Sequence, residues 1–179
     1  TVAMVPMTAF ASTKLTAVDE ISTAVDENFV SIVELSKNDD QVDIDETKYA
    51  NGFEVILKLT NGEFAKDDDD KYIMETGEYA NYVEAETTTA MKNALLATIK
   101  AVDVINDTTA YITLDTVTFN QSEEEPDYKA CVLPIVAKAV ETGDVTATFT
   151  SNVTQFKKAS EVIATAYGED VSIEVEGIK

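Results

Sequence analysis

The chain has 179 residues, enough for one domain with its own core, and its 45% hydrophobic content excludes a natively disordered chain. Its 34 acidic side chains stand against 13 lysines, giving a net charge of −21, and arginine, histidine and tryptophan are absent. These features argue against nucleic-acid binding, against phosphoryl transfer, and against catalysis or metal ligation by histidine.

Residues 1–12 are uncharged and mostly apolar, and Pro6 interrupts them. We expect an extended arm that lies on a neighbouring subunit through Val2, Val5 and Phe10, by strand addition or by filling a groove. Packing on its own domain is the alternative. Residues 13–179 are predicted to form a single globular α+β domain.

Residues 13–36 are predicted to form an amphipathic helix. Acidic side chains such as Asp19 and Asp26 lie off its apolar stripe, although the β-branched residues near its end leave a strand possible there. The stripe advances in steps of three or four residues and consists of Leu15, Val18, Ile21, Val25, Phe29 and Ile32.

The middle of the chain alternates strand and helix signals. Residues 53–59 read as a strand, followed by Asn61-Gly62 as a hairpin turn and by Asp67–Asp70 as an exposed loop. Residues 84–105 have the apolar spacing and alanine content of a helix. Residues 109–119 are rich in threonine and β-branched side chains, which predicts a strand.

The last third repeats this pattern. Pro134 leaves residues 129–140 ambiguous, because proline is unfavourable inside a helix. Strands are predicted over 144–150 and 170–176, and a short helix over 155–167. The expected fold class is therefore α+β: a mostly antiparallel β-sheet or sandwich with two to three helices and an extended N-terminal arm.

Two groups of carboxylates are candidates for a calcium site. Neither group has the ligand spacing of an EF-hand loop, and the alternative for both is a solvated surface loop. The candidate ligands are Asp39, Asp40, Asp43 and Asp45 in the first group and Asp67 and Asp69 in the second.

No combination of residues points to an enzyme or a cofactor. Cys131 lies in an apolar run and reads as a buried small side chain, since no histidine is present to activate a thiol. Asn106, Asn120 and Asn152 match the glycosylation acceptor pattern, which would matter for a cell-surface protein. The Thr/Val/Ala-rich composition resembles that of self-assembling coat, tube, pilus and surface-layer subunits.

The predicted function is a non-enzymatic structural subunit of a large homo-assembly. A phage virion protein (tail tube, capsid or decoration protein) is the first hypothesis, with copies of itself and other structural proteins of the particle as partners. An extracellular filament, pilus or surface-layer subunit is the alternative, and a small calcium-binding module is a further one. Neither direct nucleic-acid binding nor a membrane span is expected.

Overall fold

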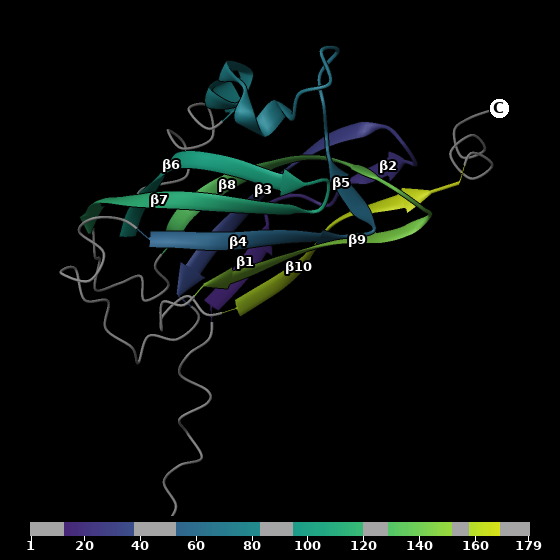
Figure 1. The fold of residues 1–179 in the computed structure, drawn as a ribbon. Coiled ribbons are helices and arrows are strands. Elements are labelled where there is room, and N and C mark those ends of the chain that lie inside the picture. Colours follow the sequence, from purple (N-terminus) through teal and green to yellow (C-terminus); the bar gives the residue numbers. More distant parts are fainter. Residues whose placement is uncertain (1–12, 38–52, 83–94, 120–128, 152–157, 169–179) are drawn as a thin grey trace, which may run out of the picture.

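Two β-sheets stacked face to face form the protein in the computed structural model, which describes residues 13–37, 53–82, 95–119, 129–151 and 158–168 (Figure 1). The four-stranded sheet has the order β1 (Thr13–Ala17), β3 (Asn28–Lys37), β8 (Lys129–Ala139), β5 (Gly62–Phe64). The six-stranded sheet has the order β2 (Ser22–Ala24), β10 (Lys158–Tyr167), β9 (Gly143–Ser151), β4 (Phe53–Thr60), β7 (Thr109–Phe119), β6 (Leu95–Asn106).

Antiparallel pairing dominates both sheets. Only β2, which joins β10 over three residue pairs, runs parallel to its neighbour among the named strands. The predicted mostly antiparallel sheet or sandwich is confirmed, but the α+β class is not, because the described residues are mostly strand with very little helix. The strands expected at 53–59, 109–119 and 144–150 are present with nearly the expected bounds, and the strand expected at 170–176 lies outside the described residues.

The core lies between the sheets and follows the two-residue period of the strands. In β4, Val55, Leu57 and Leu59 are buried while the residues between them are exposed or half-buried, because successive side chains point to opposite faces. The largest fully buried side chains come from both sheets and are Phe64, Phe149, Leu35, Leu57, Ile112, Leu114, Leu133, Ile135, Ile163 and Val33.

The helix predicted over 13–36 is wrong, because this segment forms β1, β2 and β3. The supposed stripe does not share one environment: Val18 is 51% exposed, whereas Val33, which lies off the stripe, is fully buried. Two turns break the segment, and Asp26 in the second turn has a positive φ of 67°. β3 then alternates with period two, since Phe29, Ser31, Val33 and Leu35 are all buried.

The other two predicted helices are also wrong over their described parts. Residues 95–106 form β6 and residues 158–167 form β10, whereas 84–94 and 155–157 lie outside the described ranges. The described helical structure is the 3-10 turn η2 (Ile73–Glu75) and the α-helical residues 77–82. Sheet pairing has overridden local helix propensity here, because strand formation buries long-range apolar partners.

Asn61-Gly62 joins the two sheets instead of closing a hairpin. β4 pairs with β7 and β9 in the six-stranded sheet, whereas β5 pairs with β8 in the four-stranded sheet. Asn61 has a φ of 60°, which allows the abrupt change of direction. A Cβ on Gly62 would lie 2.6 Å from Cγ1 of Val145, so the crossing needs glycine for close packing.

Pro134 is accommodated inside β8. It pairs with Ile32 of β3 on one side, and β5 covers only the last part of β8, at Ala137–Ala139, on the other side. The hydroxyl of Tyr79 donates a 2.6 Å hydrogen bond to the carbonyl oxygen of Pro134, which satisfies the backbone where β5 is absent. The helical residues 77–82 are thereby fastened to the four-stranded sheet.

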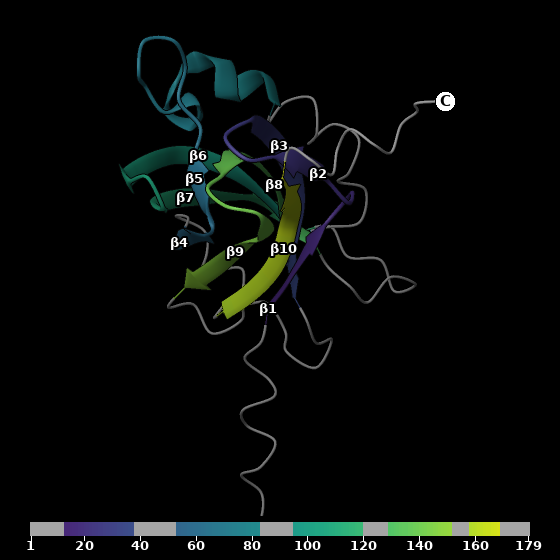
Figure 2. The same ribbon diagram turned by 90° about the vertical axis from the view of Figure 1, so that its right-hand side faces the viewer.

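Four turns gather at one end of the sandwich, which we call the turn end: β2–β3, β4–β5, β6–β7 and β8–β9. Backbone hydrogen bonds tie the turns together, including those from Asp26 N to Ala139 O at 3.0 Å and from Val140 N to Asn61 O at 3.1 Å. Figure 2 turns the side that carries the turn end toward the viewer, and β10 and β1 lie side by side there.

Candidate functional site

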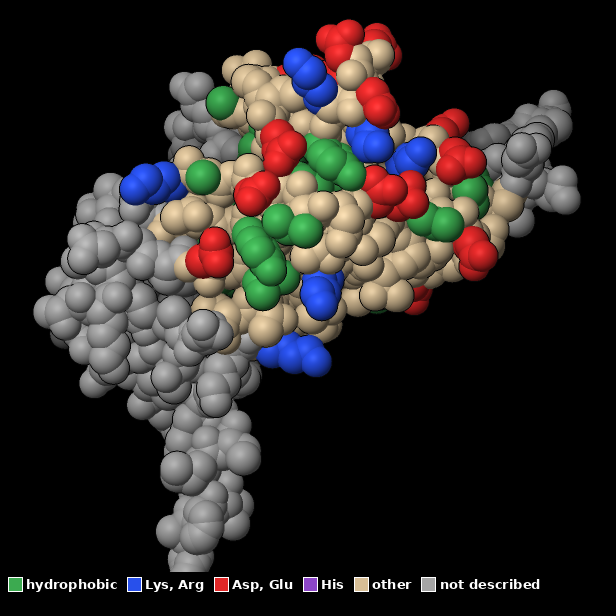
Figure 3. Space-filling view, in the orientation of Figure 1, with side chains coloured by type: hydrophobic (Ala, Val, Ile, Leu, Met, Phe, Trp, Pro, Cys, Tyr) green, Lys and Arg blue, Asp and Glu red, His purple; other side chains and the backbone are tan. Residues whose placement is uncertain are grey.

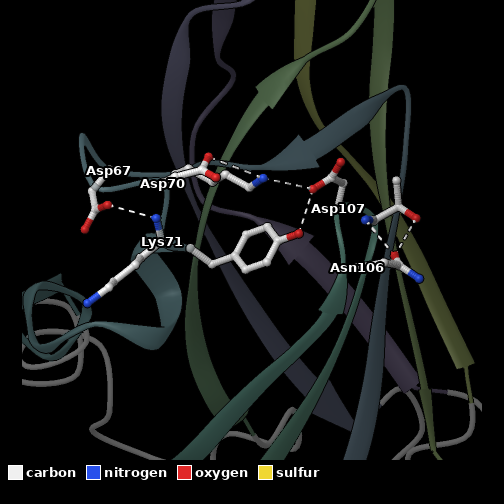
Figure 4. Close-up of polar contacts among 8 residues, drawn as sticks. Asp67, Asp70, Lys71, Asn106 and Asp107 are labelled. Carbon is white, nitrogen blue, oxygen red and sulfur yellow. Dashed lines mark hydrogen bonds and ion pairs between the residues drawn. The ribbon is translucent and has the colours of Figure 1, made fainter.

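A polar cluster of Lys66, Asp70, Tyr72 and Asp107 lies at the turn end (Figure 4). The Tyr72 hydroxyl donates a 2.6 Å hydrogen bond to Oδ1 of Asp107. Nζ of Lys66 lies 3.7 Å from Oδ1 of Asp107 and 3.6 Å from Oδ1 of Asp70, and 5.1 Å from the centre of the Tyr72 ring. The cluster joins the chain that follows β5 to the β6–β7 turn.

The electrostatics of this cluster do not prepare it for acid–base chemistry. The hydrogen bond to the Asp107 carboxylate, together with burial and neighbouring negative charge, raises the pKa of Tyr72 to about 12. The same hydrogen bond and the charge of Lys66 lower the pKa of Asp107, against a smaller opposing effect of burial. Both pKa values move away from neutrality, whereas a general acid or base works best near the ambient pH.

A small cavity of about 280 Å³ opens beside the cluster. Its walls bring together four carboxylates, two lysines and the polar side chain of Asn28, with Phe64 as the apolar member. The two lysines offset only half of the four carboxylates, so the lining keeps a net negative charge. The lining residues are Asp26, Asn28, Glu63, Phe64, Lys66, Asp70, Asp107 and Lys138.

The acidic loop at 67–70 is a tight, exposed turn. Oδ1 of Asp67 accepts hydrogen bonds from the backbone N–H of Asp69 and of Lys71, both at 2.9 Å, so this carboxylate holds its own turn. Asp69 is exposed. Within the described ranges, no three acidic or cysteine side chains gather closely enough to hold a metal ion. The other calcium candidates, Asp39, Asp40, Asp43 and Asp45, lie outside those ranges.

The second candidate site is the outer face of the six-stranded sheet, which Figure 3 shows from the front. Strand register places hydroxyl side chains side by side across β4, β7, β9 and β10, around Ile56 and the partly exposed Tyr111. We define this outer sheet face by its outward residues: Glu54, Ile56, Lys58, Thr60, Ala101, Asp103, Thr109, Tyr111, Thr113, Asp144, Thr146, Thr148, Thr150, Lys158, Ser160 and Val162.

The outer sheet face is nearly neutral in a strongly acidic chain. The described residues that define it include three carboxylates and two lysines, whereas the whole chain has a net charge of −21. In Figure 3 its charged side chains are scattered over a broad polar surface with a small apolar patch. A second molecule of the same charge can approach such a face with less repulsion than it meets at an acidic loop.

The outer sheet face was not predicted from the sequence, although its pattern is present there. Polar side chains occupy every second position in 144–150, with threonine at 146, 148 and 150, and in 109–113 two threonines flank Tyr111, which indicates one polar face of each strand. Only the strand order shows that these faces are contiguous. The predicted arm residues Val2, Val5 and Phe10 lie outside the described ranges, so the arm stays a prediction.

Comparisons with protein-family models, with curated proteins and with solved structures found no match. In the part of the chain that the structure describes, none of the helices has the length and apolar character needed to cross a membrane.

Proposed function

We propose that the protein is a structural subunit of a large homo-assembly, with a phage virion as its setting, as a tail tube, capsid or decoration protein. The observation that carries the proposal is the outer sheet face: a broad, hydroxyl-rich and nearly neutral surface on a chain of net charge −21. Copies of the chain can lie side by side at the margins of this face with less electrostatic repulsion than strongly acidic surfaces would cause.

The turn end supports the proposal by its construction. Its polar groups are engaged with one another: Asn61 bonds the β8–β9 turn, Tyr72 bonds Asp107, and Lys66 lies between two carboxylates. The shifts in the pKa values of Tyr72 and Asp107 favour a fastening role over a catalytic one. A rigid subunit with closed turns suits an assembly that repeats one geometry many times.

Light scattering and electron microscopy of the purified chain test the proposal. We expect particles, rings or filaments that grow with protein concentration. Because net negative charge opposes association, raising NaCl from about 0.05 to about 0.5 M should increase the assembled fraction. A chain that stays monomeric at millimolar concentration in both salts would contradict the proposal and would make ligand and calcium screens the next step.

The arm is tested separately by a chain that lacks residues 1–11 and by a full-length variant with Val2→Ser, Val5→Ser and Phe10→Ser. The substituted variant keeps the length of the arm and removes its large apolar side chains. If the arm docks on a neighbour, both variants should assemble far less than the parent chain. Equal assembly by all three chains would show that the arm has no role in association.

A further inference from the structure

We infer that copies associate side by side and head to tail, so that the β6 margin of one copy meets the β10 margin of the next and Asp103 pairs with Lys158 of the neighbouring copy. This inference rests on the proposed function and specifies the contact through which it works. Its starting point is the order of side chains across the outer sheet face.

One register row crosses the face with opposite charges at its two ends. Lys158 of β10 pairs with Thr150 of β9, which pairs with Ile56 of β4, which pairs with Tyr111 of β7, which pairs with Asp103 of β6. Both terminal residues are exposed. The row therefore ends in a positive side chain on β10 and a negative side chain on β6, and repetition of the molecule along the row brings these two charges together.

Strand direction makes this contact repeatable. Four antiparallel steps separate β10 from β6, so the two marginal strands run in the same direction. Each marginal strand also has an exposed aliphatic side chain on the C-terminal side of its charged residue. These are Ile105, 50% exposed, after Asp103 on β6, and Val162, 42% exposed, after Lys158 on β10. Two different margins that complement each other form a heterologous contact, which generates a ring or an open helical array.

Both margins are also protected against addition of a backbone strand. β6 departs from its register with β7 at three places, and the Val104 N–H is taken by a carboxylate oxygen of Glu75 at 2.7 Å. On the other margin, β10 has a register shift between Val162 and Ala164, and β2 pairs with its end. Such irregularities and caps block edge pairing, so side chains must make the contact between copies.

The inference is tested by charge reversal in the full chain, measured as the protein concentration at which half of it assembles. Asp103→Lys and Lys158→Asp should each raise this concentration about tenfold, because each places like charges in contact at every junction. The double variant Asp103→Lys with Lys158→Asp should restore assembly to near the parent value. Circular dichroism checks that each variant is folded.

Matched controls lie on the same face but away from its margins. Glu54→Lys and Lys58→Asp make the same charge changes on the central strand β4, where both side chains are exposed, and should leave the half-assembly concentration within about twofold. If the parent chain assembles and the marginal single reversals behave like these controls, or if the double variant is not rescued, the inference fails while the proposed function stands. A parent chain that never assembles overturns both.

Discussion

The interior of the sandwich and its turn end are held together by different physical means. The interior is apolar and close-packed, with Leu57, Ile112 and Phe149 fully buried between the sheets. The turn end relies on directional polar contacts, such as the Tyr72–Asp107 hydrogen bond and the three hydrogen bonds between the Asn61 side chain and the β8–β9 turn. Apolar contacts in the interior do not depend on the direction in which two side chains approach, whereas the hydrogen bonds at the turn end do.

This difference separates stability from geometry. Burial of apolar surface contributes most of the folding free energy, because it scales with area and needs no precise alignment. Net hydrogen-bond contributions are smaller, since water competes for the same groups, but an unmatched buried polar atom is costly. Substitutions in the interior should therefore change stability most, and substitutions at the turn end should show which turns depend on one another.

The largest effect is expected at the core of β4. Leu57→Ala removes a fully buried side chain and should lower the free energy of unfolding by about 3 kcal/mol, through lost burial and the cavity left behind. Ile56→Ala, the next residue on the same strand but on the outer sheet face, should cost about 1 kcal/mol or less. Urea unfolding of the two variants measures the contrast. Equal losses would mean that the two faces of β4 are not distinct.

The next largest effect is expected at Asn61, where two substitutions separate the stability contributed by the side chain from that contributed by the backbone conformation. Asn61→Gly removes the hydrogen bonds to the β8–β9 turn but keeps the positive φ, and should cost about 1 kcal/mol. Asn61→Ala should cost about 1 kcal/mol more, because a Cβ disfavours the left-handed conformation. Thermal unfolding of the two variants tests this order, and a more stable Ala variant would contradict it.

A smaller effect is expected at Tyr72. Tyr72→Phe removes the hydrogen bond to Asp107 and should cost about 1 kcal/mol or less at neutral pH, since the Asp107 side chain is 48% exposed. Because folding lowers the pKa of Asp107, this stabilisation is lost as the pH falls through that lowered pKa. Because folding raises the pKa of Tyr72 to about 12, it is complete below pH 10 and is lost as the pH rises through about 12.

The difference in unfolding free energy between the parent and Tyr72→Phe should accordingly be level from about pH 5 to pH 9. It should shrink at acid pH. A difference that keeps growing below pH 4 would show that the hydrogen bond is not the source of the stabilisation.

The smallest effect should have the opposite sign. Oγ of Ser31 is buried on β3 and finds no hydrogen-bond partner among the described residues. Ser31→Ala removes this unmatched hydroxyl and should raise the free energy of unfolding by about 0.5–1 kcal/mol. Removal of a hydroxyl is thus expected to stabilise the protein in the interior variant Ser31→Ala and to destabilise it in the turn-end variant Tyr72→Phe. A loss of stability in Ser31→Ala would indicate a partner from outside the described ranges.

The strands that alternate cleanly could be predicted from the sequence. In 53–59 and 144–150, apolar side chains occupy every second position, and these segments form β4 and β9. The segment 13–36 could not, because its apolar residues also fit a helical spacing. Val33 and Leu35, which are fully buried, belong to the strand period and not to the helical one. The spacing of apolar residues in the sequence cannot distinguish a helix from a strand here, because Leu15 and Phe29 fit both the helical period and the two-residue period of a strand.

Some features of the candidate sites could likewise be predicted from the sequence, and others could not. The exposed Asp67–Asp70 turn was readable from its run of acids, and the absence of arginine and histidine from the sequence limited the possible chemistry. The bond between Tyr72 and Asp107 joins residues 35 positions apart. The row from Lys158 to Asp103 crosses five strands whose order is not their order in the chain.

The sequence by itself determined the charge, the limited chemistry and the strands with an unambiguous two-residue period, because these depend on residue type and on neighbours one or two positions away. The tertiary structure alone decided that 13–36, 95–106 and 158–167 are strands, that Asn61-Gly62 crosses between sheets, and that a neutral face exists. Those features depend on pairing between distant segments, where burial of apolar surface on the partner strand outweighs local propensity.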